Sequence, residues 1–92
     1  MAKFTADTGA TPRLISAAGF TKASVYTSGT LSTATARLQW KNENGEYIDY
    51  TDGELTINDE LKLPHGNHRD VYVDVSGSDG STLLYVEYNG YE

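Results

Sequence analysis

Residues 69–88 read RDVYVDVSGSDGSTLLYVEY, and this stretch decides the fold class. Two runs of alternating apolar and polar residues flank the pair Asp79–Gly80. Alternation with a period of two is typical of a β-strand with one buried face, and Asp-Gly between two such runs is a strong hairpin signal. We therefore predict an antiparallel β-hairpin that turns at Asp79–Gly80.

The register of this hairpin would assign each side chain to a face of the sheet. With Asp79–Gly80 as the central pair, three pairs point inward: Val75 with Leu84, Val73 with Val86, and Val71 with Tyr88. Two pairs point outward: Tyr72 with Glu87, and Asp74 with Tyr85. In this register Tyr72 and Tyr85 would be diagonal neighbours on the outer face.

A second hairpin is predicted around residues 42–46, because the segment 35–41 (TARLQWK) also alternates. A two-residue turn at Asn44–Gly45 would mix apolar and polar side chains on each face. A three-residue loop, 43–45, instead places Trp40 opposite Ile48 and Leu38 opposite Tyr50, with Gly45 left-handed. A slip of one residue inverts every side chain, so the hydrophobic pattern selects the three-residue loop. We expect Trp40 to be the largest side chain of the core.

The remaining chain continues as short strands with frequent turn signals and no amphipathic helix. The fold class predicted is all-β, a small antiparallel β-sandwich of about seven or eight strands, Ig-like or jelly-roll-like. A small β-barrel is the alternative. Residues 1–12 are polar apart from Phe4 and read as a flexible N-terminal arm, either disordered or docked on a neighbouring subunit, so the single sandwich domain would span residues 13–92.

Composition excludes several classes of function. The chain has 92 residues, which is one small domain, and a formal net charge of −6. Binding to nucleic-acid phosphates requires a basic surface, so nucleic acid is not an expected partner. There is no cysteine, and no segment has the apolar length of a signal peptide or membrane span. We expect a soluble protein made in the cytoplasm, with no membrane partner.

The residues that could perform catalysis or bind metal form no convincing set. His65 and His68 have no cysteine to complete a metal site, and they read as two solvated loop histidines. The acidic residues Asp49, Asp52 and Glu54 could in principle act on sugars, but a chain this short builds no deep cleft, so a solvated acidic loop is the preferred interpretation. We therefore predict no catalytic residue, no cofactor and no metal, and no enzymatic activity.

Tyrosines are the remaining candidates for a functional surface. The chain contains seven, and strand alternation points several of them outward. Tyrosine offers a large contact area at low entropic cost, although it also stabilises strands without any binding role. The candidate interaction surface consists of Phe4, Tyr26, Tyr47, Tyr72 and Tyr85.

The order of turns and core signatures resembles small β-sandwich structural proteins of tailed bacteriophages. The matching features are Leu-Gln-Trp at 38–40, Asn-Gly at 44–45, Tyr47, Leu-Thr at 55–56, Leu-Pro-His-Gly at 63–66, and the valine-rich run 71–77. The resemblance covers about residues 29–88. These positions are architectural, so they carry over no functional residues.

The resemblance implies a non-enzymatic virion structural protein. Capsid decoration, by binding to the major capsid protein or another virion protein on the outer capsid surface, is the leading role. A head or tail fibre component is the next. The expected location is the virion, after assembly in the host cytoplasm, and a homotrimer is a candidate assembly. A carbohydrate-binding module is the alternative from a different class.

Overall fold

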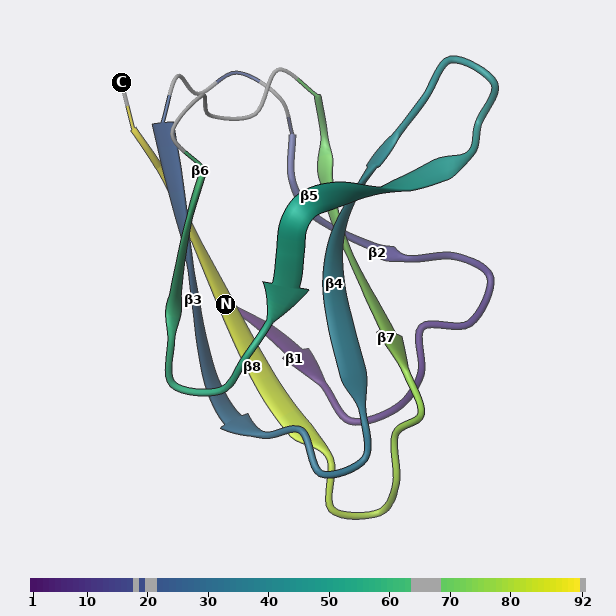
Figure 1. Ribbon diagram of the computed structural model, residues 1–92, viewed down its shortest axis with the longest axis vertical. Coiled ribbons are helices and arrows are strands. Elements are labelled where there is room, and N and C mark those ends of the chain that lie inside the picture. The colour runs from purple at the N-terminus through teal and green to yellow at the C-terminus, as the bar shows by residue number, and fades with distance from the viewer. Residues whose placement is uncertain (18, 20–21, 64–68, 92) are drawn as a thin grey trace.

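The computed structural model describes residues 1–17, 19, 22–63 and 69–91 (Figure 1). These residues form eight strands and no helix, so none of the described segments is a helix that could span a membrane. The strands are β1 (Ala2–Phe4), β2 (Arg13–Ser16), β3 (Lys22–Thr30), β4 (Thr35–Lys41), β5 (Tyr47–Leu55), β6 (Glu60–Leu63), β7 (Val71–Ser76) and β8 (Leu83–Tyr91).

The strands form two four-stranded antiparallel sheets that pack against each other. Sheet A has the order β1-β8-β3-β6, and sheet B has the order β2-β7-β4-β5. Only β4 and β5 are successive strands within one sheet; every other connection passes to the opposite sheet. This strand order is that of an eight-stranded jelly roll. The prediction of a small all-β sandwich is confirmed, and the two sheets do not close into a barrel.

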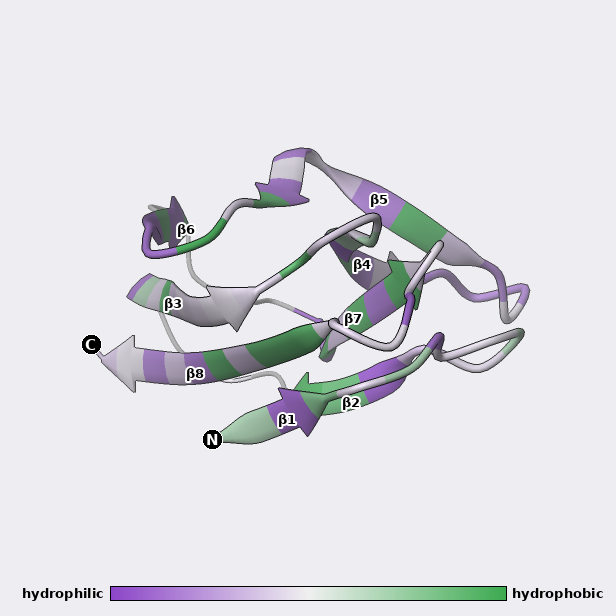
Figure 2. Ribbon diagram, turned by 90° about the horizontal axis from the view of Figure 1, so that it is seen from below, coloured by the Kyte–Doolittle hydropathy of each residue, from purple (hydrophilic) through white to green (hydrophobic). Residues whose placement is uncertain are grey.

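The core lies between the sheets and is built from the inward residues of each alternating strand. Apolar and polar residues alternate along β7, as Figure 2 shows, and its valines are fully buried. The core cluster consists of Ala2, Phe4, Val25, Ala36, Leu38, Leu55, Val71, Val73, Val75, Leu84 and Val86. The predicted inward faces of residues 71–75 and 84–86 are therefore confirmed, and Tyr88 is partly buried against the same cluster.

The predicted hairpin at Asp79–Gly80 is wrong. β7 pairs with β2 and β4, whereas β8 pairs with β1 and β3, so none of the predicted pairs between the two strands forms. The connecting segment instead crosses between the sheets and is bonded to the loop before β4. Thr33 Oγ1 donates to Gly77 O at 2.6 Å, and Ser32 Oγ donates to Asp79 Oδ2 at 2.6 Å. Alternation buries the same residues in both arrangements, so it could not distinguish them.

The β4–β5 hairpin has the predicted three-residue loop. Trp40 pairs with Ile48, Asn42 N donates to Glu46 O at 2.9 Å, and Gly45 has a φ of +83°. The predicted pair of Leu38 with Tyr50 does not form. A large bulge in β5 intervenes, because the ladder passes from Gln39–Asp49 directly to Arg37–Glu54. Residues 50–53 therefore lie opposite a single β4 residue.

Trp40 is half-buried and lies outside the core cluster, contrary to expectation. It lies near the end of β4, where the β4–β5 hairpin extends beyond the sandwich (Figure 1), and its partner Ile48 is 36% exposed. The Arg69 guanidinium lies 4.9 Å from the Trp40 ring centroid. The largest fully buried side chains are instead Leu38 and Leu84.

The N-terminal residues differ from the flexible arm expected from their composition. β1 pairs with β8, with Ala2 opposite Val86, and Phe4 is only 4% exposed. The polar residues that follow also bond to the sandwich: Thr8 N donates to Val75 O at 3.0 Å. One large apolar side chain buried between the sheets, followed by polar groups that satisfy backbone atoms of β7, is enough to include this segment in the domain.

Candidate functional site: the two outer faces

The predicted surface residues are divided between opposite faces of the molecule. Tyr26 and Tyr85 lie on the outer face of sheet A, while Tyr47 and Tyr72 lie on the outer face of sheet B. Phe4 is buried in the core and is not available to a partner. The five residues therefore do not form one surface, and Tyr72 and Tyr85 are not neighbours, because their strands belong to different sheets.

On sheet A the aromatic residues follow β3 and β8. Tyr26 pairs with Glu87 across the ladder, which makes Tyr26 and Tyr85 diagonal neighbours on the same face. Tyr26 is 39% exposed and Tyr91, at the end of β8, is 45% exposed. A hydrogen bond with the Glu60 carboxylate raises the pKa of the Tyr26 hydroxyl above its ordinary value. The sequence prediction omitted Tyr91, although extending the alternation of β8 to its end would have included it.

On sheet B two tyrosine rings meet across β4. Tyr47 and Tyr72 pack edge to face with ring centroids 5.1 Å apart and planes at 80°. The Lys41 ammonium lies 5.5 Å from the Tyr47 ring centroid. Leu14, opposite Tyr72 on β2, is 49% exposed and extends the aromatic pair with an apolar side chain.

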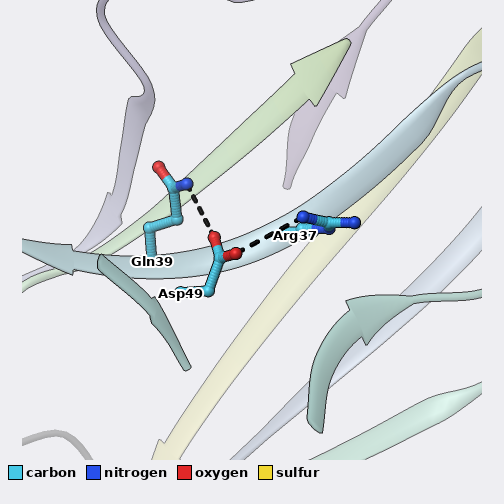
Figure 3. Close-up of polar contacts among 3 residues, drawn as sticks. All are labelled: Arg37, Gln39 and Asp49. Carbon is cyan, nitrogen blue, oxygen red and sulfur yellow. Dashed lines mark hydrogen bonds and ion pairs between the residues drawn. The ribbon is translucent and has the colours of Figure 1, made fainter. Parts of the chain in front are cut away.

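Next to these rings is a polar cluster centred on Asp49 (Figure 3). Gln39 Nε2 donates to Asp49 Oδ1 at 2.8 Å, and Arg37 Nη1 contacts Asp49 Oδ2 at 3.4 Å. The other amide atom, Gln39 Oε1, is shielded from solvent and has no hydrogen-bond partner among the described residues. A buried polar atom without a partner loses its hydration without compensation, so the burial of Gln39 Oε1 costs stability.

Two hollows of about 210 Å³ each adjoin this cluster. The first is lined by outward residues of three neighbouring strands: Thr35, Arg37, Gln39, Asp49, Asp74 and Ser76. The second lies over the β5 bulge and is lined by Arg37, Asp49, Tyr50, Asp52, Gly53 and Glu54. Arg37 and Asp49 line both hollows, and we call the combined depression the Arg37 groove.

The β5 bulge shapes the second half of the Arg37 groove. Asp52 has a φ of +56°, which is uncommon for a residue other than glycine. Gly53 is needed beside it, because a Cβ there would lie 2.9 Å from both Tyr50 Cβ and Tyr50 O. Bulges are over-represented beside functional sites, where they redirect side chains. Here the bulge brings Glu54 back into the ladder opposite Arg37.

The Arg37 groove was not predicted, although the sequence pattern already indicated part of its lining. Alternation already pointed Arg37 and Gln39 outward, and the three-residue loop implied that Gln39 would pair with Asp49. The bulge, which sets Arg37 between Asp49 and Glu54, left no such signal. The acidic residues Asp49 and Asp52, interpreted as a solvated loop, are strand and bulge residues that line this groove.

Metal-ligand chemistry has no candidate within the described residues, which contain no group of three or more His, Cys, Asp or Glu side chains placed to hold an ion. His65 and His68 lie outside the described residues. Their interpretation as solvated loop residues, and the expectation that the protein needs no metal, stay predictions.

Comparison with models of protein families, with curated proteins and with solved structures found no match. The jelly-roll topology therefore rests on the strand order alone, and no similar protein indicates a function. A jelly roll supports many unrelated functions, so function has to be inferred from the side chains on its two outer faces.

Proposed function

We propose that this protein is a non-enzymatic structural protein of a bacteriophage virion that decorates the outer capsid surface, docking through the outer face of sheet A. The observation that carries the proposal is the pair of exposed tyrosines on that face, Tyr26 and Tyr91, which are 39% and 45% exposed. Tyrosine is enriched at protein interfaces and among the residues that dominate binding energy.

Other properties of the chain support the same role. We propose a phage particle because residues 29–88 resemble tailed-phage structural proteins, and jelly rolls recur in viral capsid proteins. The net charge of −6 favours a partner surface with basic patches, because complementary charge speeds association and suppresses wrong partners. On this proposal the partner is the major capsid protein or another virion protein, bound by a monomer or a homotrimer.

The test is binding to purified capsids that lack the protein. We expect saturable binding that weakens at least about tenfold in a variant carrying both Tyr26→Ala and Tyr91→Ala, because interface tyrosines are frequent hot spots. The matched control is Arg37→Ala on the opposite face, which should bind as the parent does. Binding lost in Arg37→Ala but retained in the tyrosine variant would place the docking surface on sheet B, and no capsid binding at all would refute the decoration role.

A further inference from the structure

The Arg37 groove has the properties of a small-ligand site rather than of a broad protein interface. It consists of two adjoining hollows of about 210 Å³ each, with a few polar groups converging on them. Sites for small molecules are concave and carry a limited number of placed donors and acceptors that fix the orientation of the ligand. The groove lies on sheet B, opposite the face assigned above to capsid docking, so both surfaces could be occupied at once.

The groove offers donors and acceptors side by side. A guanidinium has five N–H donors in a fixed plane, and the contact with Asp49, at 3.4 Å, holds the Arg37 side chain across the middle of the groove while leaving it 51% exposed. Asp74 Oδ1 accepts a hydrogen bond from Thr8 Oγ1 at 2.9 Å, which fixes a second carboxylate at the wall.

The charge of the lining limits the class of ligand. Four carboxylates, Asp49, Asp52, Glu54 and Asp74, and one guanidinium line the two hollows. An anionic ligand such as a phosphate or an acidic sugar would be repelled by this excess of negative charge. A cationic side chain would be attracted by the carboxylates but repelled by Arg37, which lines both halves and offsets part of that attraction. A neutral ligand with several hydroxyl groups meets neither obstacle, since each hydroxyl both donates and accepts hydrogen bonds.

We propose that the Arg37 groove binds a neutral sugar residue of a glycan, with Arg37 donating to its hydroxyl oxygens and Asp49 and Asp74 accepting from its hydroxyl groups. The edge-to-face pair of Tyr47 and Tyr72 stands beside the groove on the same face. It supplies an apolar flank for the carbon-bound hydrogens of a neighbouring sugar. This site is independent of the proposed capsid contact.

The experiment uses the whole chain and an array of neutral, acidic and basic oligosaccharides, followed by titration of the best binder. We expect binding to neutral glycans, reduced at least tenfold in both Arg37→Ala and Asp49→Asn. The control variant is Glu87→Gln on the outer face of sheet A, which should bind as the parent does. Both groove side chains are about half exposed, so the variants should remain folded, and thermal unfolding verifies this.

A second measurement needs no variant. In a nitrogen-proton correlation spectrum of the parent protein, the best glycan should shift the Gln39 side-chain amide and the Arg37 guanidinium while leaving Asn89, on the sheet A face, unchanged. Three results would overturn the proposal: no neutral glycan bound at millimolar concentration, binding unaffected by Arg37→Ala, or shifts confined to sheet A. Preference for a lysine- and arginine-rich peptide over every glycan would assign the groove to a basic protein segment instead.

Discussion

Gly29 illustrates how one backbone position can decide stability. It lies in the β3–β8 ladder opposite Leu84 with a φ of +103°, and a Cβ there would lie 2.0 Å from Leu83 O. We expect Gly29→Ala to lower the free energy of unfolding by at least about 2 kcal/mol, because the clash is with backbone and the conformation is unfavourable for an L-residue. Urea unfolding measures the change.

The matched control for this substitution is Gly80→Ala. A Cβ at Gly80 would have no atom within 4 Å, and Gly80 is not among the described residues with positive φ. We expect a change in stability within about 0.5 kcal/mol, as for ordinary surface substitutions. Equal losses in the two variants would contradict the close approach of β3 and β8 at Gly29.

Three carboxylates in loops make the stability of the fold depend on pH. Hydrogen bonds lower the pKa of Asp7 (from Ser78), Asp59 (from Glu60 N and Thr56) and Asp79 (from Ser32 and Ser81 N) below the ordinary value of 3.8. A carboxyl group whose pKa is lowered by folding contributes stability above its unfolded pKa and loses it as the pH falls through its folded pKa. The melting temperature should therefore decrease as the pH falls below about 4.

Asp79→Asn separates this effect from general acid denaturation. An amide keeps one acceptor oxygen and does not titrate, so the variant should be less stable near neutral pH and should lose less on acidification than the parent. Melting curves recorded by circular dichroism at a series of pH values measure both quantities. Parallel pH profiles for the parent and the variant would show that Asp79 does not contribute.

At the scale of an element, β1 is the strand whose role differs most from its composition. Phe4 is 4% exposed, whereas Lys3, between Ala2 and Phe4, points to solvent. We expect Phe4→Ala to cost about 3–5 kcal/mol, as for other buried aromatic side chains, and Lys3→Ala to be nearly neutral. Denaturant unfolding measures the free energy of unfolding of both variants. If Phe4→Ala leaves it unchanged, the N-terminal residues are a free arm after all.

Strand faces could be predicted from the sequence, but among the strand partners only the β4–β5 pair was predicted correctly. The valines of β7 and the inward residues of β8 were assigned to the core correctly, because alternation depends only on which face of a strand is apolar. The hairpin between these strands assumed that neighbours in sequence pair in space. The hydrogen bonds of Ser32 and Thr33 to the 77–79 segment, which favour the crossing, involve residues more than 40 positions apart and leave no local pattern.

In the candidate site, too, the faces of side chains were predictable, whereas contacts between strands were not. Tyr47 and Tyr72 were correctly pointed outward, but their contact across β4 depends on strand order, which alternation does not specify. The prediction of Leu38 opposite Tyr50 assumed a regular ladder, and the bulge at residues 50–53 broke it. In this bulge the backbone of Gly53 packs closely against Tyr50, a contact that alternation along the strand does not indicate.

At the scale of the whole molecule, the topology predicts which positions can be joined covalently. The chain has no cysteine, so a pair of introduced cysteines can form a disulfide only with each other within one molecule. Ser28 and Tyr85 are partners in the β3–β8 ladder and point to the same face. Antiparallel partners have Cα atoms about 4.5–5.5 Å apart, within the range that a disulfide spans. The variant Ser28→Cys/Tyr85→Cys should therefore close a disulfide on mild oxidation, with a mass loss of about two hydrogen atoms.

The discriminating control is Asp74→Cys/Tyr85→Cys. These positions would be direct partners if β7 and β8 formed a hairpin, but they lie on opposite outer faces of two sheets whose backbones are about 10 Å apart. This pair should stay reduced in the folded protein and should form a bridge only after unfolding. Intact-mass analysis with and without urea separates the cases. Closure of the Asp74–Tyr85 pair in the folded state, with Ser28–Tyr85 remaining open, would replace the jelly-roll order by one with a terminal hairpin and would separate Tyr26 from Tyr85 on the proposed docking face.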